Sequence, residues 1–214
     1  MTVYRVLSLP QFTKFPHKAA QLIWKLSKNK NAANGAIMRT SILGAYEFWN
    51  YDKVESNTEK IAKVTHWDKR CVGSCVIITS IIAHILNENI YLNPSQIITI
   101  AEKYDCNIKP YIEKSLSKDI SELNLDEQSS MGYTLKTLSA GLWAYFNAEC
   151  FETGLIKVIN EGGDADTNAS VACSLLGAKF GYNSIPQKYI VGLNKRNLLE
   201  EKYSNFIDIL KRSL

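Results

Sequence analysis

The fold is decided by residues 131–180, which read MGYTLKTLSAGLWAYFNAECFETGLIKVINEGGDADTNASVACSLLGAKF and contain three helical patterns in succession. In the first, apolar side chains recur at spacings of four, three, four and three residues, the stripe of a packed helix (Met131, Leu135, Leu138, Leu142 and Tyr145). A second stripe runs from Phe151 to Ile159, and Gly162 and Gly163 then end that helix. A third helix is predicted over roughly 165–180, and its small side chains allow a neighbouring helix to approach closely.

The remainder of the chain is also predicted to be helical, because no long stretch alternates apolar and polar residues with period two. Helices are expected over 18–28 and 69–86, and Pro94 suits the first turn of another. Apolar residues at helical spacing follow the Asn34-Gly35 turn, whereas the polar residues 50–63 predict a loop or a short solvated helix. The sequence therefore predicts an all-α, compact bundle of roughly eight to ten helices, in a single domain over residues 1–214.

The composition is that of a folded domain without a nucleic-acid-binding signature. Hydrophobic residues make up 46% of the 214 residues, charged residues make up 21%, and the formal charge is +4. The 25 basic residues occur throughout the chain, with no block of like charge and no interleaving with aromatic residues of the kind that binds single strands. Binding to nucleic acid is therefore not expected.

The cysteines and the apolar segments predict an intracellular, cytoplasmic protein that does not cross a membrane. Five cysteines are an odd number at uneven spacing, which argues against a disulfide framework and for a reducing compartment. The N-terminal residues lack the apolar core and cleavage site of a secretory signal. The most apolar stretch, 72–86, is about 15 residues long and a bilayer needs roughly 20, so a buried helix is expected there.

Two aspartates stand two positions apart in residues 160–173, NEGGDADTNASVAC, where the third predicted helix begins. Asp164 and Asp166 there can act as a helix cap with an additional surface acid, because a helix start carries unpaired N–H groups. One aspartate suffices for a cap, however, and two carboxylates with the Thr167 hydroxyl supply three oxygen ligands of the kind Mg²⁺ prefers. The sequence of this motif matches neither an EF-hand loop nor a phosphate-binding loop. A metal site and a cap remain alternatives on the residues alone.

The segment 131–186, with GGDADTNA at its centre, resembles the C-terminal signature of the ADP-ribosylglycohydrolase family, of the dinitrogenase-reductase-activating type. Upstream and in the same order, NGAIMR at 34–39 is similar to the family's Asn-Gly-x-x-Met-Arg segment. THWDKR at 65–70 is similar to its Thr-His-x-Asp-x-Arg segment. The resemblance implies an all-α orthogonal bundle and metal-dependent hydrolysis of the bond that joins ADP-ribose to a protein side chain or small acceptor. The implied partners are ADP-ribose and ADP-ribosylated proteins.

The resemblance also assigns site residues. Three residues fall on positions that bind a two-metal centre of Mg²⁺ or Mn²⁺ in the family: Asp164, Asp166 and Thr167. Six others fall on segments that line the ADP-ribose pocket, and we expect them to contact the ligand: Asn34, Gly35, Ala36, Met38, Arg39 and His66. No catalytic residue is assigned.

Simpler interpretations of several of these residues stay open on the sequence alone. An Asn-Gly pair is a common turn, and His66 is typical of a capping or core histidine. Cys71 and Cys75, one helical turn apart, are expected to pack in the interior, because no partner metal ligands accompany them. Tyr133 and Trp143 are expected in the core rather than stacked on a base.

The sequence also departs from the family pattern. The family has an N-terminal part with a Gly-Asp segment, a catalytic acid and a Thr-Asp-Asp cluster that completes the metal centre, and this sequence contains no Asp-Asp or Thr-Asp pair. An N-terminally truncated bundle that holds one metal ion or none is therefore expected. Either it is a hydrolase completed by another N-terminal polypeptide, an upstream region, Glu47 or Asp68, or it is an inactive ADP-ribose-binding or protein-interaction module. Exposed apolar faces would then give a marginal monomer or an oligomer.

Overall fold

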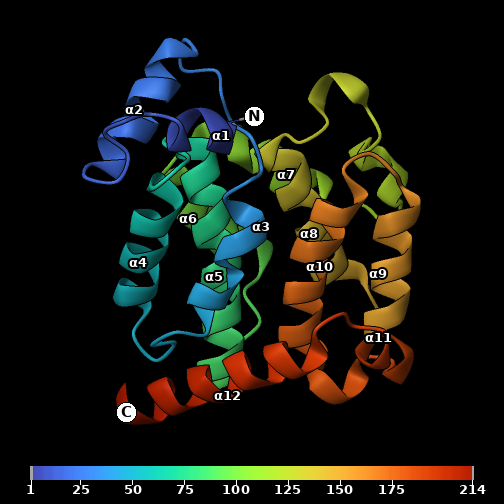
Figure 1. The fold of residues 1–214 in the computed structure, drawn as a ribbon. Helices are drawn as coiled ribbons and strands as arrows, with labels where there is room; N and C mark the ends of the chain where they lie inside the picture. Colours follow the sequence, from blue (N-terminus) through green and yellow to red (C-terminus); the bar gives the residue numbers. More distant parts are fainter. Residues whose placement is uncertain (1, 214) are drawn as a thin grey trace.

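The computed structural model describes residues 2–213, and the regular structure of that part of the chain is helical (Figure 1). Its α-helices are α1 (Thr2–Leu7), α2 (Pro16–Leu26), α3 (Ile37–Thr40), α4 (Tyr51–Lys63), α5 (Lys69–Glu88), α6 (Pro94–Glu102), α7 (Lys109–Lys114), α8 (Thr134–Asn147), α9 (Phe151–Asn160), α10 (Ala165–Phe180), α11 (Gln187–Val191) and α12 (Arg196–Ser213). Short 3-10 turns lie between several of them, and an isolated β-bridge joins Ala33 to Tyr133. The prediction of an all-α bundle is confirmed.

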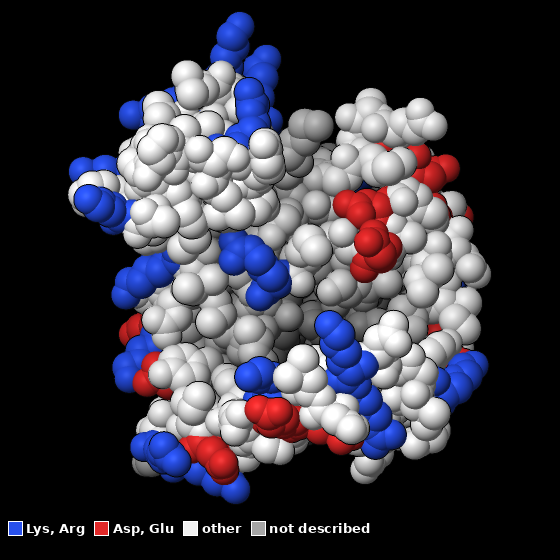
Figure 2. Space-filling view, viewed as in Figure 1, with Lys and Arg blue, Asp and Glu red and all other residues white. Residues whose placement is uncertain are grey.

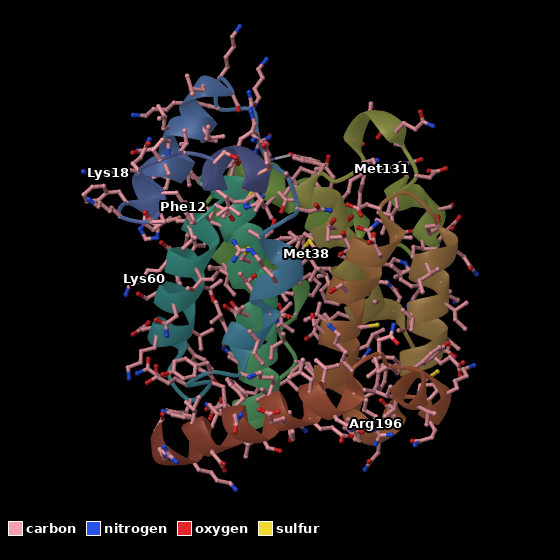
Figure 3. The ribbon with its side chains drawn as sticks, viewed as in Figure 1. Phe12, Lys18, Met38, Lys60, Met131 and Arg196 are labelled. Carbon is pink, nitrogen blue, oxygen red and sulfur yellow. The ribbon has the colours of Figure 1, made fainter. Side chains whose placement is uncertain are left out.

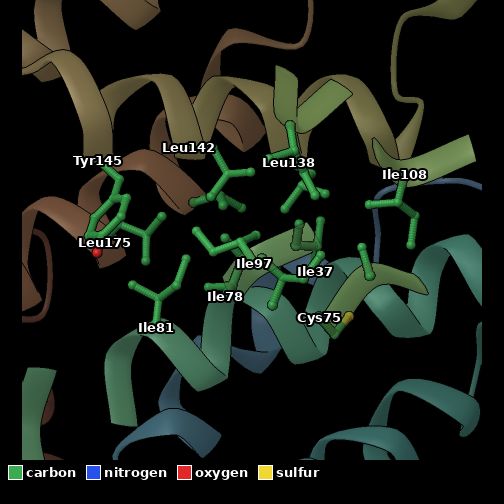
Figure 4. Close-up of a cluster of buried hydrophobic side chains, with 14 of the residues drawn as sticks. Ile37, Cys75, Ile78, Ile81, Ile97, Ile108, Leu138, Leu142, Tyr145 and Leu175 are labelled. Carbon is green, nitrogen blue, oxygen red and sulfur yellow. The ribbon is translucent and has the colours of Figure 1, made fainter. Parts of the chain in front are cut away.

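Helix α5 lies at the centre of the bundle. Its isoleucines pack against apolar side chains of α8 and α10, as the labelled residues Ile78, Leu142 and Leu175 show (Figure 4). The helix is long and apolar enough to cross a bilayer, but 72% of its most apolar window is buried inside the protein. It is therefore the core helix of the bundle, as the 72–86 segment predicts.

Helices α8, α9 and α10 form a tightly packed group beside α5 (Figure 1). Small residues set the spacing. A Cβ atom added to Gly141 of α8 would lie 2.8 Å from the Val171 Cγ1 of α10, and one added to Gly154 of α9 would lie 2.7 Å from the Ala148 Cβ. Gly141 therefore lets α8 and α10 approach closely, and Gly154 does the same for α9 and the end of α8. The three helices predicted over 131–180 are confirmed, and Trp143 is buried among them.

The N-terminal third of the bundle differs from the predicted elements. The residues after the Asn34-Gly35 turn form only the single turn α3 and a 3-10 turn, because the chain then crosses α5 closely. A Cβ atom on Gly44 would lie 2.6 Å from the Thr79 carbonyl oxygen. The polar segment 50–63 is a full helix, α4, whose buried residues Val54, Thr58 and Ala62 recur every four positions and face α5.

The two ends of the chain lie outside this core. Helices α1 and α2 have a small apolar cluster of their own, built by Val6, Ala19, Ala20 and Ile23. Helix α12 runs along one edge of the bundle (Figure 1) and buries none of its described residues. It exposes Leu198, Leu199 and Tyr203. The apolar faces expected of a truncated bundle, and its oligomerisation, stay predictions.

Candidate functional site

A two-glycine turn delivers the acidic motif to the start of α10. Gly162 and Gly163 both have positive φ angles, +71° and +66°. A Cβ atom on Gly163 would lie 2.1 Å from the carbonyl oxygen of Leu125, so only glycine fits there. The turn ends α9 as predicted and places Asp164 at the N-cap position of α10.

The Asp164 side chain does not cap the helix that it begins. It makes no hydrogen bond to the first turn of α10, and its Oδ2 instead accepts one from Asn34 Nδ2 at 2.7 Å, across 130 residues of sequence. The backbone N–H of Thr167 is satisfied by Asp166 Oδ1 at 2.9 Å. Helix capping therefore does not account for the orientation of the Asp164 carboxylate.

Asn34 is held firmly at this place. It is 7% exposed, and its backbone N–H donates to the Gly132 carbonyl at 2.9 Å. Its second side-chain donor bond, also 2.9 Å, goes to the Thr137 hydroxyl, which donates in turn to Asn168 Oδ1 at 2.9 Å. The segment before α3 and the first turns of α8 and α10 are thus joined by one chain of hydrogen bonds.

Gly132 lies next to both polar side chains. It has a φ of +78°, and a Cβ atom there would lie 3.6 Å from Asp164 Oδ2 and 3.9 Å from Asn34 Oδ1. Both side-chain donor hydrogens of Asn34 are used in the bonds to Asp164 and Thr137. Its Oδ1 atom accepts no hydrogen bond from residues 2–213, so it remains available to a ligand.

Asp166 is exposed next to this group. Its interaction with the neighbouring Asp164 carboxyl, followed by the Thr167 N–H, lowers the pKa of Asp166. Two close carboxylates and a hydroxyl are hard oxygen ligands, which suits Mg²⁺ or Mn²⁺ with water completing the coordination. Within the described part of the chain no three acidic, histidine or cysteine side chains converge, so the ligand set falls short of a two-metal centre.

A second group of predicted residues lies directly behind Asn34. Arg39 donates from a terminal guanidinium nitrogen to the Thr65 hydroxyl at 2.6 Å, and that hydroxyl lies 2.8 Å from His66 Nδ1. The imidazole packs on Gly35, where a Cβ atom would lie 3.1 Å from the His66 Cε1. Burial, and then the charge of Arg39, lower the pKa of His66 to about 4, so the ring is neutral at pH 7.

The other residues that the resemblance assigns to the site differ in their exposure. Met38 is exposed on the side of α3 that faces α8 and α10 (Figure 3), and Arg39 is also exposed. Ala36 is fully buried in the core, so its side chain does not reach the surface and only its backbone could contact a ligand. Thr167 is buried at the start of α10. The structure thus brings Asn34 to the acidic motif, and it places Gly35 and His66 beside Asn34.

Two acids considered as substitutes for the missing catalytic groups have other partners. Asp68 is buried, accepts two side-chain hydrogen bonds from Arg70 at 2.8 Å each, and accepts a third from Trp24 at 3.0 Å. Glu47 forms an ion pair with Lys53 at 2.5 Å. Cys71 and Cys75 are buried as predicted, whereas Tyr133 is only half-buried and hydrogen bonds to Arg70 through its hydroxyl, at 3.3 Å.

The site also includes Thr137, Asn168 and Gly132, which are not predicted from the sequence. Asn168 follows Thr167 in the acidic motif, so its position was a usable signal, whereas Thr137 looks like an ordinary residue of α8. A cavity of about 1010 Å³ lies elsewhere, where the apolar side chains of α9 to α12 meet. Its lining residues lie toward the far end of α10 from Asp164, and the polar convergence at Asn34 and Asp164 is therefore the better candidate site.

The fold and this site define an all-α protein with an acidic, oxygen-rich site at the start of a helix. Among solved structures, an ADP-ribosylglycohydrolase-related protein complex has the same fold, with a TM-score of 0.65 at 21% identity, covering 92% of this chain and 75% of that chain. A model of the ADP-ribosylglycohydrolase family matches residues 5–213. The chain belongs to the ADP-ribosylglycohydrolase family.

Two named relatives are similar in sequence over part of their length. The ADP-ribosylarginine hydrolase Tri1 of Serratia proteamaculans is 23% identical over 184 residues, 85% of this chain and 47% of that protein. The ADP-ribosyl-[dinitrogen reductase] glycohydrolase of Rhodospirillum rubrum is 33% identical over 81 residues, 38% of this chain and 27% of that protein. The matched regions thus span half or less of each of these relatives.

Proposed function

We propose that the site around Asn34, Asp164 and Asp166 binds the ADP-ribosyl group of a modified protein or small acceptor and hydrolyses the bond that joins them. In this proposal Asp164, Asp166 and Thr167 hold one Mg²⁺ or Mn²⁺ ion. The observation that carries the proposal is the 2.7 Å hydrogen bond from Asn34 to Asp164, which turns a carboxylate away from its own helix toward a neighbouring segment. Family membership supplies the reaction class.

Each side chain has a physical part in the proposed reaction. Asn34 fixes the orientation of the Asp164 carboxylate and keeps its own Oδ1 free for a ligand. Asp166 places negative charge near the position where positive charge develops at the anomeric carbon during glycoside cleavage. When bound, a divalent cation would orient ribose hydroxyls and a water molecule.

The phosphates of the ligand are proposed to lie near Arg39. Its guanidinium Nε donates to the Gly35 carbonyl at 3.1 Å, so the cation lies alongside the turn that also carries Asn34. The His66 ring packs against Gly35 of the same turn. Because its lowered pKa leaves it neutral, it adds no charge to the site at pH 7. Arg39 is thus the cationic group of this segment that can pair with a phosphate.

One observation favours a second function. Because the described residues bring no third acidic side chain to Asp164 and Asp166, a general acid or base is not evident among them. The alternative is a module that binds ADP-ribose or an ADP-ribosylated protein without hydrolysing it. The two functions share the same binding residues and differ only in turnover.

The test measures binding and turnover separately. ADP-ribose binding is followed by calorimetry with Mg²⁺, with Mn²⁺ and with a chelator, and release of ADP-ribose from ADP-ribosylated protein and from ADP-ribosylarginine is followed by chromatography. We expect Asp166→Ala to abolish release and to weaken cation-dependent binding, and we expect Asp208→Asn on the exposed side of α12 to change neither. Binding without release in the wild type would select the binding module, and absence of both would refute the proposal.

A further inference from the structure

The formal charge of the chain is distributed unevenly along the sequence. The first 46 residues contain seven of the 25 basic residues and none of the 21 acidic ones, which leaves 18 basic and 21 acidic residues for the rest. Figure 2 shows Lys and Arg side chains around the α1–α2 end of the molecule, whereas acidic side chains gather over the upper ends of α9 and α10. The two signs of charge are therefore separate in the upper half of this view, whereas they are mixed along its lower edge.

Within residues 2–213 the basic residues of this end form no ion pairs with acidic side chains. We call the surface of residues 2–31 the α1–α2 face, and its cations are Arg5, Lys14, Lys18, Lys25, Lys28 and Lys30. All six are exposed, and none forms an ion pair with another residue in the described range 2–213. Lys18 points outward (Figure 3), with its ammonium 5.0 Å from the centre of the Phe15 ring. Six such like charges are free to attract an acidic partner.

The same face also exposes large apolar side chains. The inner side of α2 packs Ala19, Ala20 and Ile23 against α1. The same helix exposes Leu22 and 67% of Leu26, and it also carries the exposed Lys18 and Lys25. A partner with both acidic and apolar side chains would contact these leucines and the neighbouring cations together.

A polar pocket completes the face. It has a volume of about 380 Å³ and lies between α1 and the end of α2, with Arg5 and Lys30 among its lining residues and no acidic side chain. Thr2, Ser27 and Asn31 provide further polar groups. Two cations and neutral hydrogen-bonding groups around one pocket suit a carboxylate side chain of a partner.

This face adjoins the candidate site. Ala33 lines the pocket and directly precedes Asn34, and the Cγ2 atom of Val3 in α1 lies 3.3 Å from where a Cβ atom of Gly35 would stand. A macromolecule seated on the α1–α2 face would therefore reach the residues that position Asp164.

We infer that the α1–α2 face is a docking surface for an acidic protein surface, that of the ADP-ribosylated protein whose modified side chain enters the candidate site. The inference rests on the proposed function. An acidic protein patch fits better than a nucleic acid or an anionic membrane, because such extended polyanions would also meet the acidic groups near the Gly162 turn, such as Asp126 and Glu161. The exposed apolar side chains of α2 suit the same occupant.

The experiment compares two substrates that differ only in the docking part. One is ADP-ribosylarginine, and the other is a helical peptide of about 20 residues, rich in glutamate and leucine, that ends in an ADP-ribosylated arginine. The charge-reversal variant carries Lys14→Glu, Lys25→Glu and Lys28→Glu. The control variant carries the same change of charge on α12 (Lys202→Glu, Lys211→Glu and Arg212→Glu).

We expect charge reversal on the α1–α2 face to raise KM for the peptide at least about tenfold at low salt, to leave kcat unchanged, and to leave both constants unchanged for ADP-ribosylarginine. The control variant should behave like the wild type. Equal effects on both substrates, or an effect of the control variant as large as that of the α1–α2 variant, would overturn the inference.

A binding measurement decides the matter even if the chain hydrolyses neither substrate, which would refute only the proposed turnover. Fluorescence anisotropy gives Kd for the unmodified acidic peptide, a short DNA duplex and vesicles of phosphatidylcholine with phosphatidylserine. We expect salt-dependent binding of the peptide that is lost on charge reversal. Tighter binding of the duplex or of the vesicles, or peptide binding that charge reversal does not weaken, would refute a protein docking surface.

Discussion

Replacing Asn34 by alanine tests the central contact of the candidate site. The substitution removes a donor bond of 2.7 Å to the Asp164 carboxylate and one of 2.9 Å to the Thr137 hydroxyl. A bond to a charged group contributes about 1.5–3 kcal/mol and a neutral one about 1 kcal/mol, but Asp164 is half-exposed and regains water. We therefore expect the free energy of unfolding to fall by about 2 kcal/mol, or the melting temperature by roughly 4–8 °C.

Urea unfolding at pH 7 measures this loss, and Asn205→Ala on the exposed side of α12 is the matched control. The control should lie within about 0.5 kcal/mol of the wild type, because it removes no contact. If Asn34→Ala is equally stable, the hydrogen bond to Asp164 is not formed in solution and the argument from its geometry fails.

A second variant of the same residue separates the structural role from the cation site. Asn34→Asp replaces the donor by a carboxylate beside that of Asp164, and the two charges repel. We expect this variant to be less stable than Asn34→Ala without divalent cations and to recover on addition of Mg²⁺, since a cation between carboxylates offsets their repulsion. The midpoint of urea unfolding with and without Mg²⁺ shows the difference. No response to Mg²⁺ or Mn²⁺ would contradict a cation at this position.

Three further predictions concern the supports of the site. Gly163→Ala should destabilise the protein by more than about 3 kcal/mol in urea unfolding, because its Cβ atom would collide with the Leu125 carbonyl, whereas Gly177→Ala, in open space on α10, should stabilise it by about 0.5–1 kcal/mol. His66, with its pKa lowered to about 4, should contribute stability that is fully present above the unfolded pKa of about 6.5. This contribution, up to about 3 kcal/mol, is lost as the pH falls toward 4, and His66→Gln should flatten that part of the stability profile. Lys136→Met removes the ammonium group that binds a backbone carbonyl and a glutamate of the loop before α8, so residues 124–131 should be cleaved roughly fivefold faster in limited proteolysis.

The sequence predicts the helices of the core, α5, α8, α9 and α10, but it does not predict α12 or the elements that tertiary contacts define. Residues 131–180 carry three complete stripes with a glycine stop, and α8, α9 and α10 follow them closely. For residues 50–63 the sequence leaves a loop and a short solvated helix as alternatives, and it does not predict the full length or the packing of α4. The buried residues of α4 are few and small, so its pattern is that of a solvated segment until α5 is placed against it. The helix expected after Gly35 is broken where Gly44 touches the backbone of α5, a contact that no local pattern indicates.

One part of the candidate site could be predicted from the local sequence, and the other part could not. The turn at Gly162 and the position of Asp164 can be predicted from the local sequence. Glycine suits the positive φ angles, and a helical pattern begins directly after the turn. The contact with Asn34 spans 130 residues, and only the family resemblance grouped the two segments. Thr137 could not be identified in advance, because a threonine within an apolar helix gives no sign that its hydroxyl links two other elements.

The orientation of Asp164 is the strongest reason to regard this turn as functional. An aspartate at an N-cap position that bonds to its own helix contributes about 1 kcal/mol, and here that contribution is absent because the side chain bonds to Asn34 instead. The first turn of α10 is served by Asp166, which caps the adjacent Thr167 N–H from within the helix. A turn shaped only by stability would need one acid, pointed at the helix. This turn has two acids, and the half-buried one, Asp164, points toward Asn34 in a distant segment. The Asn34 Oδ1 atom beside Gly132 then remains open as an acceptor. This arrangement suits the binding of a ligand better than the capping of the helix.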